Sequence, residues 1–317
     1  MAPNILLITA DDMDALTPGA FGGPADVTPN LDALAASGRI FRRSHVPIAV
    51  CQPSRSAIMT GLWPHRNGAE GFEPIHDGVP LLTQLLAAHG YVTGILGKVE
   101  HIQPVERFGW DLKRGMVELG MGRDPEAYGR AAAEFFALAG DREAPWFLMA
   151  NAHDPHRPFH GSLAEMEKWT VEERETYPDP SAEYGPDHVP PRFLPGGMVR
   201  APFQLTDVLP SVLEAAGVSA DSGGGVSFLP AARGEVPVPH PLYWEHIGNA
   251  AIRDGDWKAV REAGRPWELY DLAADRSELH DLASQHPEIV DRLAADWQRW
   301  ADRVGVISWD LIKEQGA

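Results

Sequence analysis

Asn4-Ile5-Leu6-Leu7-Ile8-Thr9-Ala10-Asp11-Asp12 is a short apolar run that ends in two adjacent carboxylates. Such a run is typical of a buried parallel strand, so we predict a central strand over residues 4–9. Open α/β sheets bind their ligands beyond the carboxyl ends of the strands, where Asp11 and Asp12 would lie. Adjacent carboxylates repel each other unless a cation lies between them, so the pair predicts a site for a hard divalent cation. A turn or a helix cap is the alternative interpretation of an Asp-Asp pair.

Strands and helices alternate along the first two thirds of the chain, which predicts a mainly parallel sheet flanked by helices. We expect helix 28–38 to have Thr28 as its N-cap and Gly38 as its stop. Polar residues follow three strands, and we expect them to converge on one site. The expected strands are 4–9, 40–46, 91–96 and 146–150, and the expected helices are 28–38, 54–60, 79–89, 127–139 and 205–216.

The last hundred residues have a different pattern. Residues 242–272 supply aromatic and apolar faces and predict an antiparallel meander, with Asp254-Gly255 as a hairpin turn. A helix is expected over residues 287–304, with Trp297 and Trp300 on its apolar side. We therefore predict an α/β domain over residues 1–217 and a smaller C-terminal subdomain over residues 218–317.

The composition of the 317-residue chain is that of an ordinary soluble protein, with 44% hydrophobic and 23% charged residues. A formal net charge of −18 argues against nucleic-acid binding, which needs a basic surface. It does not exclude an anionic substrate, because a buried cation and a few basic side chains can reverse the local field. No secretory signal or membrane-spanning stretch is visible, so we expect a cytoplasmic protein without a membrane partner.

Cys51 is the only cysteine and begins the stretch Cys51-Gln52-Pro53-Ser54-Arg55. A single thiol cannot form an intrachain disulfide. A lone cysteine is more often a small buried residue than a nucleophile, but Pro53 and Arg55 at these offsets favour a chemical role. We expect Cys51 in a loop just before a helix that starts near Ser54, where backbone N–H groups favour negative charge. Arg55 would offer a planar cation to an oxyanion, or else make a structural ion pair.

The Cys-x-Pro-Ser-Arg stretch and the Asp11-Asp12 pair resemble the type I sulfatases, formylglycine-dependent members of the alkaline phosphatase superfamily. His153 to Arg157 and Trp267 to Asp271 are similar to heparan N-sulfatase (sulfamidase), and Glu245 to Asn249 also occurs in arylsulfatase-like members. The resemblance implies an alkaline-phosphatase-like α/β fold with a small C-terminal antiparallel sheet and helix. It extends over residues 4–12, 28–38, 51–61, 97–101, 153–157, 243–260 and 267–272.

The resemblance also implies an activity, the hydrolysis of a sulfuric ester or sulfamate on a small molecule or glycan. In that family a formylglycine-generating enzyme oxidises the motif cysteine, here Cys51, to an aldehyde whose hydrate attacks sulfur. One Ca²⁺ ion would be held by Asp11, Asp12 and residue 51. The metal activates the nucleophile, as in other covalent catalysis assisted by a metal.

Roles for further residues follow from the same resemblance. Arg55 and Lys98 would contact the sulfate or the aldehyde hydrate as cations. His101 would contact the hydrate and act as a base, and His153 would protonate the departing oxygen or nitrogen. His156, Asp154 and Arg157 would surround these groups.

One part of the family pattern is missing. The family carries a second metal-binding pair, an Asp followed by His or Asn and Gly after another apolar strand, and then a substrate-contacting Lys. No such block occurs between His156 and Thr206, so the chain reads as a sulfatase with an internal deletion near residues 194–197. We expect this loss to expose sheet or apolar surface. The candidates to replace the missing ligands are Asp154, Asp187, His188 and Asp207, of which Asp207 is more typical of a helix cap.

The sequence is compatible with three functions. The first is an active sulfatase or sulfamidase. The second is a formylglycine-dependent phosphonate or phosphodiester hydrolase. The third is a truncated relative with weak activity or none. Conversion of Cys51, parallel assays on sulfate and phosphate esters, and stabilisation by calcium distinguish these.

Overall fold

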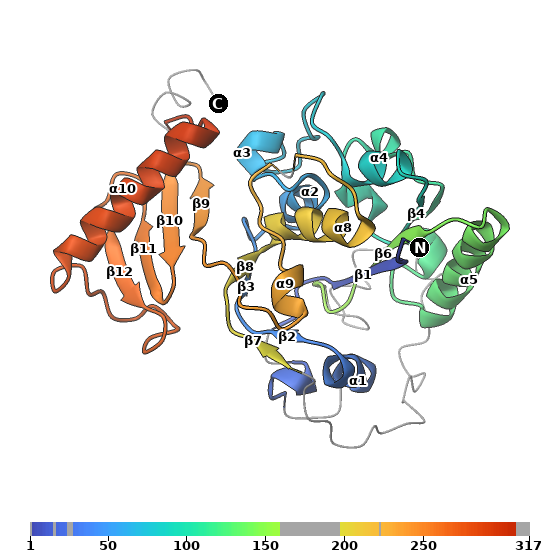
Figure 1. Ribbon diagram of the computed structural model, residues 1–317, viewed down its shortest axis with the longest axis horizontal. Helices are drawn as coiled ribbons and strands as arrows, with labels where there is room; N and C mark the ends of the chain where they lie inside the picture. The colour runs from blue at the N-terminus through green and yellow to red at the C-terminus, as the bar shows by residue number, and fades with distance from the viewer. Residues whose placement is uncertain (1, 15–16, 24–27, 159–196, 222, 309–317) are drawn as a thin grey trace.

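The computed structural model describes residues 2–14, 17–23, 28–158, 197–221 and 223–308. A four-stranded parallel sheet in the order β1-β6-β4-β5 lies at its centre (Figure 1). Pairing of parallel strands that are far apart in sequence requires crossover connections, which confirms the predicted α/β architecture. The strands are β1 (Ile5–Ala10), β4 (Val92–Leu96), β5 (Leu112–Arg114) and β6 (Trp146–Ala152).

Helices cover both faces of this sheet, because successive side chains of a strand point to opposite sides. Phe147 and Met149 of β6 pack in the cluster that includes side chains of α2, α4 and α8. Leu148, between them, packs with Phe135 of α5 on the other face. The sheet is thus held rigidly where its strand ends carry polar residues. These helices are α2 (Cys51–Thr60), α4 (Leu82–Ala87), α5 (Pro125–Asp141) and α8 (Val208–Ala216).

β1 differs from the prediction in its place and its burial. Among the described strands it lies at the edge of the sheet, not at the centre, and pairs with β6. Leu6 and Ile8 are 50% and 55% exposed, whereas every residue of β4 is buried. Uncovered apolar side chains on an edge strand are what the loss of a neighbouring strand would leave.

Cys51 is the first residue of α2, so the prediction that it lies in a loop was wrong. The preceding residue, Val50, has the extended backbone of an N-cap, and Gly61 ends the helix in the left-handed conformation. Pro53 lies in the first turn, where its missing N–H has no helical partner to lose. The prediction that Cys51 lies near a helix N-terminus is nevertheless confirmed.

The segment around residues 28–46 is less regular than predicted. α1 (Pro29–Ser37) has the expected bounds, but the Thr28 hydroxyl accepts from Gly19 N and donates to Asp32 instead of capping the helix. The single strand expected over residues 40–46 is two short strands in separate two-stranded sheets. β2 (Ile40–Phe41) pairs with β7 (Met198–Val199), and β3 (Ser44–His45) pairs with β8 (Phe203–Gln204).

Short helical segments complete the described part of the α/β region. Asp207 ends the turn before α8, and its carboxylate accepts from Gln204 N and Val226 N, so it holds loops together instead of capping α8. The short segments are η1 (Gly19–Phe21), α3 (Pro64–Asn67), η2 (Val99–His101), η3 (Val105–Phe108), η4 (Val117–Leu119), η5 (Leu205–Asp207) and α9 (Leu229–Ala232).

The C-terminal part has the predicted antiparallel meander and helix. Its sheet has the order β12-β11-β10-β9 and lies beside α10 (Figure 1). Trp297 and Trp300 of this helix are buried in the same cluster as Ile252 and Leu269 of the sheet. Gly255 lies in the tight turn between β10 and β11 with φ of 62°, which glycine adopts readily. The elements are β9 (Leu242–His246), β10 (Asn249–Asp254), β11 (Trp257–Arg261), β12 (Glu268–Asp271) and α10 (Pro287–Val304).

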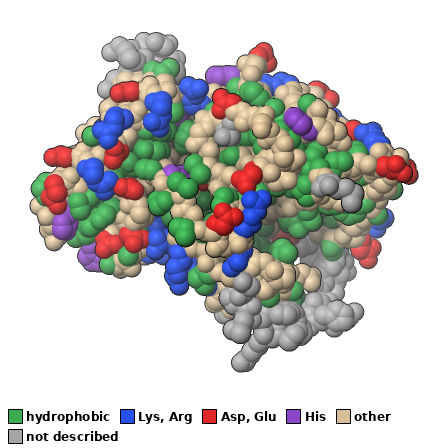
Figure 2. All heavy atoms as spheres, in the orientation of Figure 1, with side chains coloured by type: hydrophobic (Ala, Val, Ile, Leu, Met, Phe, Trp, Pro, Cys, Tyr) green, Lys and Arg blue, Asp and Glu red, His purple; other side chains and the backbone are tan. Residues whose placement is uncertain are grey.

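This subsheet packs against the rest of the protein through aromatic rings. Trp63, which precedes α3, lies with its ring centroid 5.2 Å from that of Trp300. The boundary between a domain of residues 1–217 and a subdomain of residues 218–317 stays a prediction. On the face shown in Figure 2, acidic and basic side chains alternate over α10. Within the described ranges, no helix is both long and apolar enough to cross a membrane.

Several sequence expectations concern residues outside those described. These are the loop over residues 177–197, the internal deletion near residues 194–197, and Asp187 and His188 as replacement ligands. Only Gly197 of these ranges is described, immediately before β7.

Gly97, at the carboxyl end of β4, has φ of 71°, and an added Cβ would lie 2.4 Å from the Asn151 carbonyl oxygen. We expect Gly97→Ala to lower the free energy of unfolding by more than about 2 kcal/mol, because backbone strain and a backbone clash add. Gly90→Ala is the control, since Gly90 has φ of 82° and nothing within 4 Å of the added Cβ. Its loss should be about 1 kcal/mol. Urea denaturation measures both, and equal losses would contradict the steric argument.

Candidate active site

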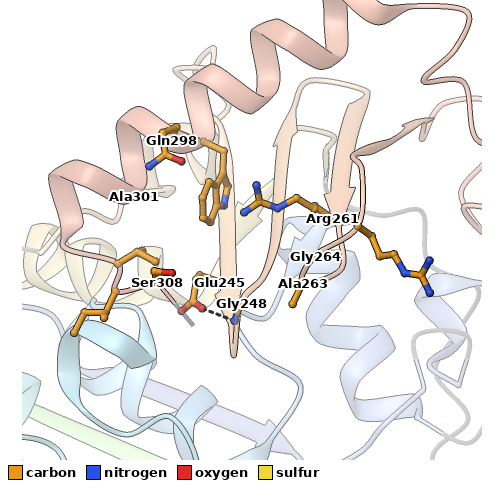
Figure 3. Close-up of a pocket in the computed structure, with 12 residues that line it drawn as sticks. Glu245, Gly248, Arg261, Ala263, Gly264, Gln298, Ala301 and Ser308 are labelled. Carbon is orange, nitrogen blue, oxygen red and sulfur yellow. Dashed lines mark hydrogen bonds between the residues drawn. The ribbon is translucent and has the colours of Figure 1, made fainter. Parts of the chain in front are cut away.

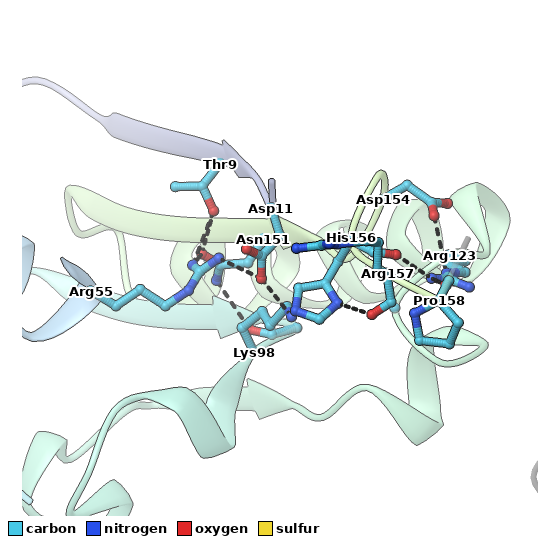
Figure 4. A network of polar contacts seen from close by, with 12 residues as sticks. Thr9, Asp11, Arg55, Lys98, Arg123, Asn151, Asp154, His156, Arg157 and Pro158 are labelled. Atoms are coloured by element: carbon cyan, nitrogen blue, oxygen red, sulfur yellow. Dashed lines mark hydrogen bonds and ion pairs between the residues drawn. The ribbon is translucent and has the colours of Figure 1, made fainter. Parts of the chain in front are cut away.

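The carboxyl ends of three neighbouring strands bring the predicted polar residues together. Asp11 follows β1, Lys98 follows β4, and His153 follows β6. The sequence analysis predicted that these strand ends converge on one site. Figure 4 shows Asp11, Lys98 and Asn151 close together in one polar network. Lys98 is only 1% exposed and Asp11 only 6%, so the site reaches well below the surface.

A buried cluster of charges forms the base of the site. Lys98 Nζ lies 2.5 Å from Asp11 Oδ2, and Arg55 Nη2 lies 3.6 Å from the same oxygen. Burial by itself raises the pKa of Asp11, but the hydrogen bond and charge of Lys98, together with Arg55, outweigh it and lower that pKa. Two cations thus face one buried anion, which leaves positive charge for an incoming anion.

The backbone is strained at two of the predicted residues. Asp12 and Lys98 both have φ of 55°, in the left-handed region that few residues other than glycine adopt. Such conformations persist only where the surrounding structure enforces them, and they cluster at functional sites. The conformation of Lys98 places its side chain at Asp11 directly after a fully buried strand.

Asn151 is a central residue that the sequence analysis did not single out. Its Oδ1 accepts from Arg55 Nη1 at 2.5 Å and from Thr9 Oγ1 at 2.8 Å. Its Nδ2 donates to the carbonyl oxygens of Leu96 and Gly97 at 3.2 and 3.0 Å. One buried amide therefore connects β1, α2 and β4, and it fixes the guanidinium of Arg55 (Figure 4). The sequence offered one sign of it, an amide that directly follows an apolar run. In the structure this amide lies opposite Thr9 of the neighbouring strand.

We expect Asn151→Ala to lower the free energy of unfolding by about 2–4 kcal/mol, because it leaves several buried donors and acceptors without partners. Asn4→Ala is the matched control. Asn4 is exposed and makes one bond of 3.3 Å to Trp146 N, so its loss should be below about 0.5 kcal/mol. Chemical denaturation followed by tryptophan fluorescence measures both, and similar losses would refute the role of Asn151.

His101 and His153 lie beside the charged cluster as neutral imidazoles. Burial, with the charges of Lys98 and Arg55, lowers the pKa of His101 to about 4. Burial, with the charges of Lys98 and Arg123, lowers the pKa of His153 to about 3. The Nδ1 atom of each ring is buried without a hydrogen-bond partner among the described residues. A negative charge placed next to these rings would raise both pKa values.

Cys51 is half-buried and lines a cavity of about 780 Å³ that Asp11, Asp12 and Arg55 also line. Arg55 lies one helical turn after Cys51 and therefore on the same side of α2. Burial lowers the pKa of the Arg55 guanidinium, and the charge of Asp11 offsets part of this effect. The remaining cavity wall is largely apolar and includes the uncovered Leu6 of β1.

The donor set suits a divalent cation, with one change from the prediction. Oxygens of Asp11 and Asp12 and a ring nitrogen of His156 lie within 4.8 Å of one another. The Cys51 sulfur does not belong to this group, and residue 51 as a ligand stays a prediction. Two carboxylates supply fewer oxygens than the six to eight that Ca²⁺ takes, so water or substrate oxygens would complete the coordination.

The segment after β6 is held in place by Arg123. Its Nη2 donates to the carbonyl oxygens of His156 and Pro158, and its Nε lies 3.1 Å from Asp154 Oδ1. This pairing engages Asp154 away from the metal group, so the structure favours His156, and not Asp154, as the replacement ligand. Within the described part of the chain, the Asp207 carboxylate accepts from Gln204 N and Val226 N and lies 3.5 Å from His240 Nε2. Arg157 is exposed.

The buried cations and the acidic pair thus lie together at the carboxyl edge of the parallel sheet. The Sulfatase family model matches residues 3–193, so the chain belongs to the sulfatase family. Members of this family generally depend on formylglycine and on a metal. The observed parallel sheet with its flanking helices and small antiparallel sheet agrees with that assignment.

Curated relatives match parts of the chain. Arylsulfatase A from Bos taurus is 48% identical over 103 residues, which is 30% of this chain and 20% of that protein. N-sulphoglucosamine sulphohydrolase from Homo sapiens is 36% identical over 167 residues, which is 50% of this chain and 32% of that protein. The matches thus cover 20% and 32% of the length of these two relatives.

Solved structures share the fold over nearly the whole chain. A structure of BT4656 in complex with its substrate D-glucosamine-2-N,6-O-disulfate has a TM-score of 0.75 and 16% identity, and covers 96% of this chain and 98% of that one. A structure of Ps i-CgsB in complex with k-i-k-neocarrahexaose has a TM-score of 0.71 and 23% identity, and covers 95% and 93%. These similarities establish the alkaline-phosphatase-like fold that the sequence predicted.

Proposed function

We propose that the protein hydrolyses a sulfuric ester or sulfamate, with formylglycine derived from Cys51 as its nucleophile and a divalent cation beside it. The observation that carries the proposal is that Cys51 opens into the same cavity as Asp11, Asp12 and Arg55. A nucleophile, a candidate metal pair and a guanidinium in one cavity are the groups that attack on a sulfuryl centre requires.

The buried cations would bind the sulfate group. Lys98 acts as a point charge and Arg55 as a planar fork that is already oriented by Asn151. Because both are buried, their attraction for an oxyanion is stronger than it would be in water. A bound sulfate group would raise the pKa of His153, which could then take up a proton and pass it to the departing oxygen or nitrogen. His101 would contact the hydrated aldehyde.

We propose a sulfated sugar as the substrate class. Support comes from the names of relatives, among them human N-sulphoglucosamine sulphohydrolase and human N-acetylgalactosamine-6-sulfatase. The solved complex of BT4656 with D-glucosamine-2-N,6-O-disulfate is a further example in this fold. A formylglycine-generating enzyme would be the maturation partner.

Calcium is the cation we propose for the carboxylates of Asp11 and Asp12, with water or substrate oxygens as further ligands. We expect Ca²⁺ at a hundred times its Kd to stabilise the native protein by about 2.7 kcal/mol relative to a chelator, seen as a higher Tm. Asp12→Asn should remove most of this gain, because it removes one of the two carboxylate charges. Asp141→Asn, an exposed change at the end of α5, is the control. Equal calcium responses in the two variants would argue against this site.

Mass and activity together test the proposal. The protein is co-expressed with a formylglycine-generating enzyme, and its intact mass shows whether the thiol of Cys51 has become an aldehyde. The converted protein is then assayed on an aryl sulfate, a sulfamate sugar and an aryl phosphonate. We expect conversion and a preference for sulfate or sulfamate. Preference for the phosphonate, or full conversion with no turnover of any substrate, would reject the proposal.

A further inference from the structure

A second cavity lies in the C-terminal part of the protein, between the end of α10 and the loops at one end of the small sheet (Figure 3). Its volume is about 520 Å³, and it shares no lining residue with the cavity around Cys51. It is lined at Gly248, Ala263 and Gly264, at the end of the sheet opposite the Asp254–Trp257 turn. At that opposite end, Asp256 of the turn pairs with Arg43.

Two arginines line this second cavity. Figure 3 shows Arg261 reaching from β11 into the space between the sheet and α10. Its guanidinium carbon lies 4.8 Å from the ring centroid of Trp267 and 5.3 Å from that of Trp297, so two indoles hold it in place. Among the described residues, neither Arg261 nor Arg265 has a carboxylate partner. In a chain with a net charge of −18, two arginines without acidic partners in one cavity mark a place for an anion.

The other lining groups suit a sugar. Trp297 offers an aromatic surface, and Gln298 and Ser308 offer hydrogen-bonding groups. Glu245 also lines the cavity, and its Oε1 accepts from Gly248 N at 3.2 Å. Burial raises the pKa of Glu245, and its carboxyl oxygens can accept from a sugar hydroxyl group. An aromatic face with polar groups around it is typical of a site for a polar ring.

We propose that this cavity binds an anionic saccharide unit, with Arg261 and Arg265 on its sulfate or carboxylate group and Trp297 beside its ring. The inference rests on the proposed function, because a sulfated glycan would supply such a unit away from the ester that is cleaved. The cavity would hold a polymeric substrate at a second point and raise its residence time on the enzyme.

Calorimetric titration with a heparin-derived hexasaccharide tests the proposal. The full chain carries Cys51→Ala, so that binding is measured without turnover, and a saturating aryl sulfate occupies the catalytic cavity. In this background Arg265→Gln should weaken binding about tenfold, since a hydrogen-bonded charge is lost. Arg265 is exposed, so its substitution spares the packing that Arg261→Gln could disturb. Arg292→Gln is the control and should change affinity by less than about twofold, because Arg292 pairs with Asp254 outside the cavity.

The outcomes separate this inference from the catalytic one. If a desulfated hexasaccharide still binds and still depends on Arg265, the cavity recognises the carboxylate group. If the desulfated hexasaccharide no longer binds, the cavity recognises the sulfate group. Equal affinities of the Arg265→Gln, Arg261→Gln and Arg292→Gln variants would overturn the proposal. So would binding of inorganic sulfate as tight as that of the hexasaccharide. A protein that hydrolyses nothing can still pass this test, and an active hydrolase can fail it.

Discussion

Cys51→Ala should reduce turnover of an aryl sulfate by at least about four orders of magnitude. Loss of a covalent nucleophile commonly costs this much or more, because the binding groups that remain cannot replace the covalent step. The measurement compares kcat/KM of the wild-type and variant proteins, both co-expressed with a formylglycine-generating enzyme. Cys51 is half-buried at the start of α2, so the fold should survive the change.

Cys51→Ser provides the matched control for this result. Serine has a similar size but is not the thiol that the maturation enzyme oxidises, so its turnover should fall as far as that of alanine. Both variants should melt within a few degrees of the wild type. Turnover above about one percent of the wild-type value in either variant would show that residue 51 is not the nucleophile.

Lys98→Met should both destabilise the protein and remove most of its activity. The change deletes the ammonium that lies 2.5 Å from Asp11 and leaves the buried carboxylate with the more distant Arg55, at 3.6 Å, as a cationic partner. Removing one partner of a buried ion pair costs about 3–5 kcal/mol. Loss of a preorganised cation that binds the oxyanion should lower kcat by a further factor of about 10²–10³. Urea denaturation and steady-state kinetics measure the two effects.

Lys113→Met is the control for Lys98→Met, because it removes the same charge from an exposed ion pair instead of a buried one. Lys113 lies 2.7 Å from Glu106, but both side chains are substantially exposed, at 44% and 87%. An exposed ion pair contributes less than about 1 kcal/mol, so this variant should keep its stability and its turnover. If the two lysine variants lost stability equally, the pairing of Lys98 with Asp11 would not have the importance assigned to it here.

The convergence of Asp11, Lys98 and His153 could be predicted because parallel strands place their carboxyl ends on one edge. Helix α10 was predictable to the residue, since Pro287 and Gly305 bracket a strongly periodic stretch. Asn151 was missed because a single amide inside an apolar strand has no sequence signal for the four bonds that it makes. Its partners are far away in sequence, and only the register of β1 with β6 brings Thr9 opposite it.

The errors also have physical causes. The apolar run of β1 indicates a strand, but the composition of a strand does not reveal which neighbours are present to cover it. Cys51 was expected in a loop before a helix that starts near Ser54, but the helix begins at Cys51, because the first turn of a helix accepts a proline such as Pro53. His156 was expected among the surrounding groups, and the path of the chain after β6, held by Arg123, instead brings its ring to Asp11 and Asp12.

Because Cys51 and Arg55 are both on α2, the helix sets the spacing between the reactive group and the cation that would grip the substrate. Each residue inserted between them would rotate one relative to the other by about 100° around the helix axis. The number of residues between the two positions therefore matters more to this geometry than their identity.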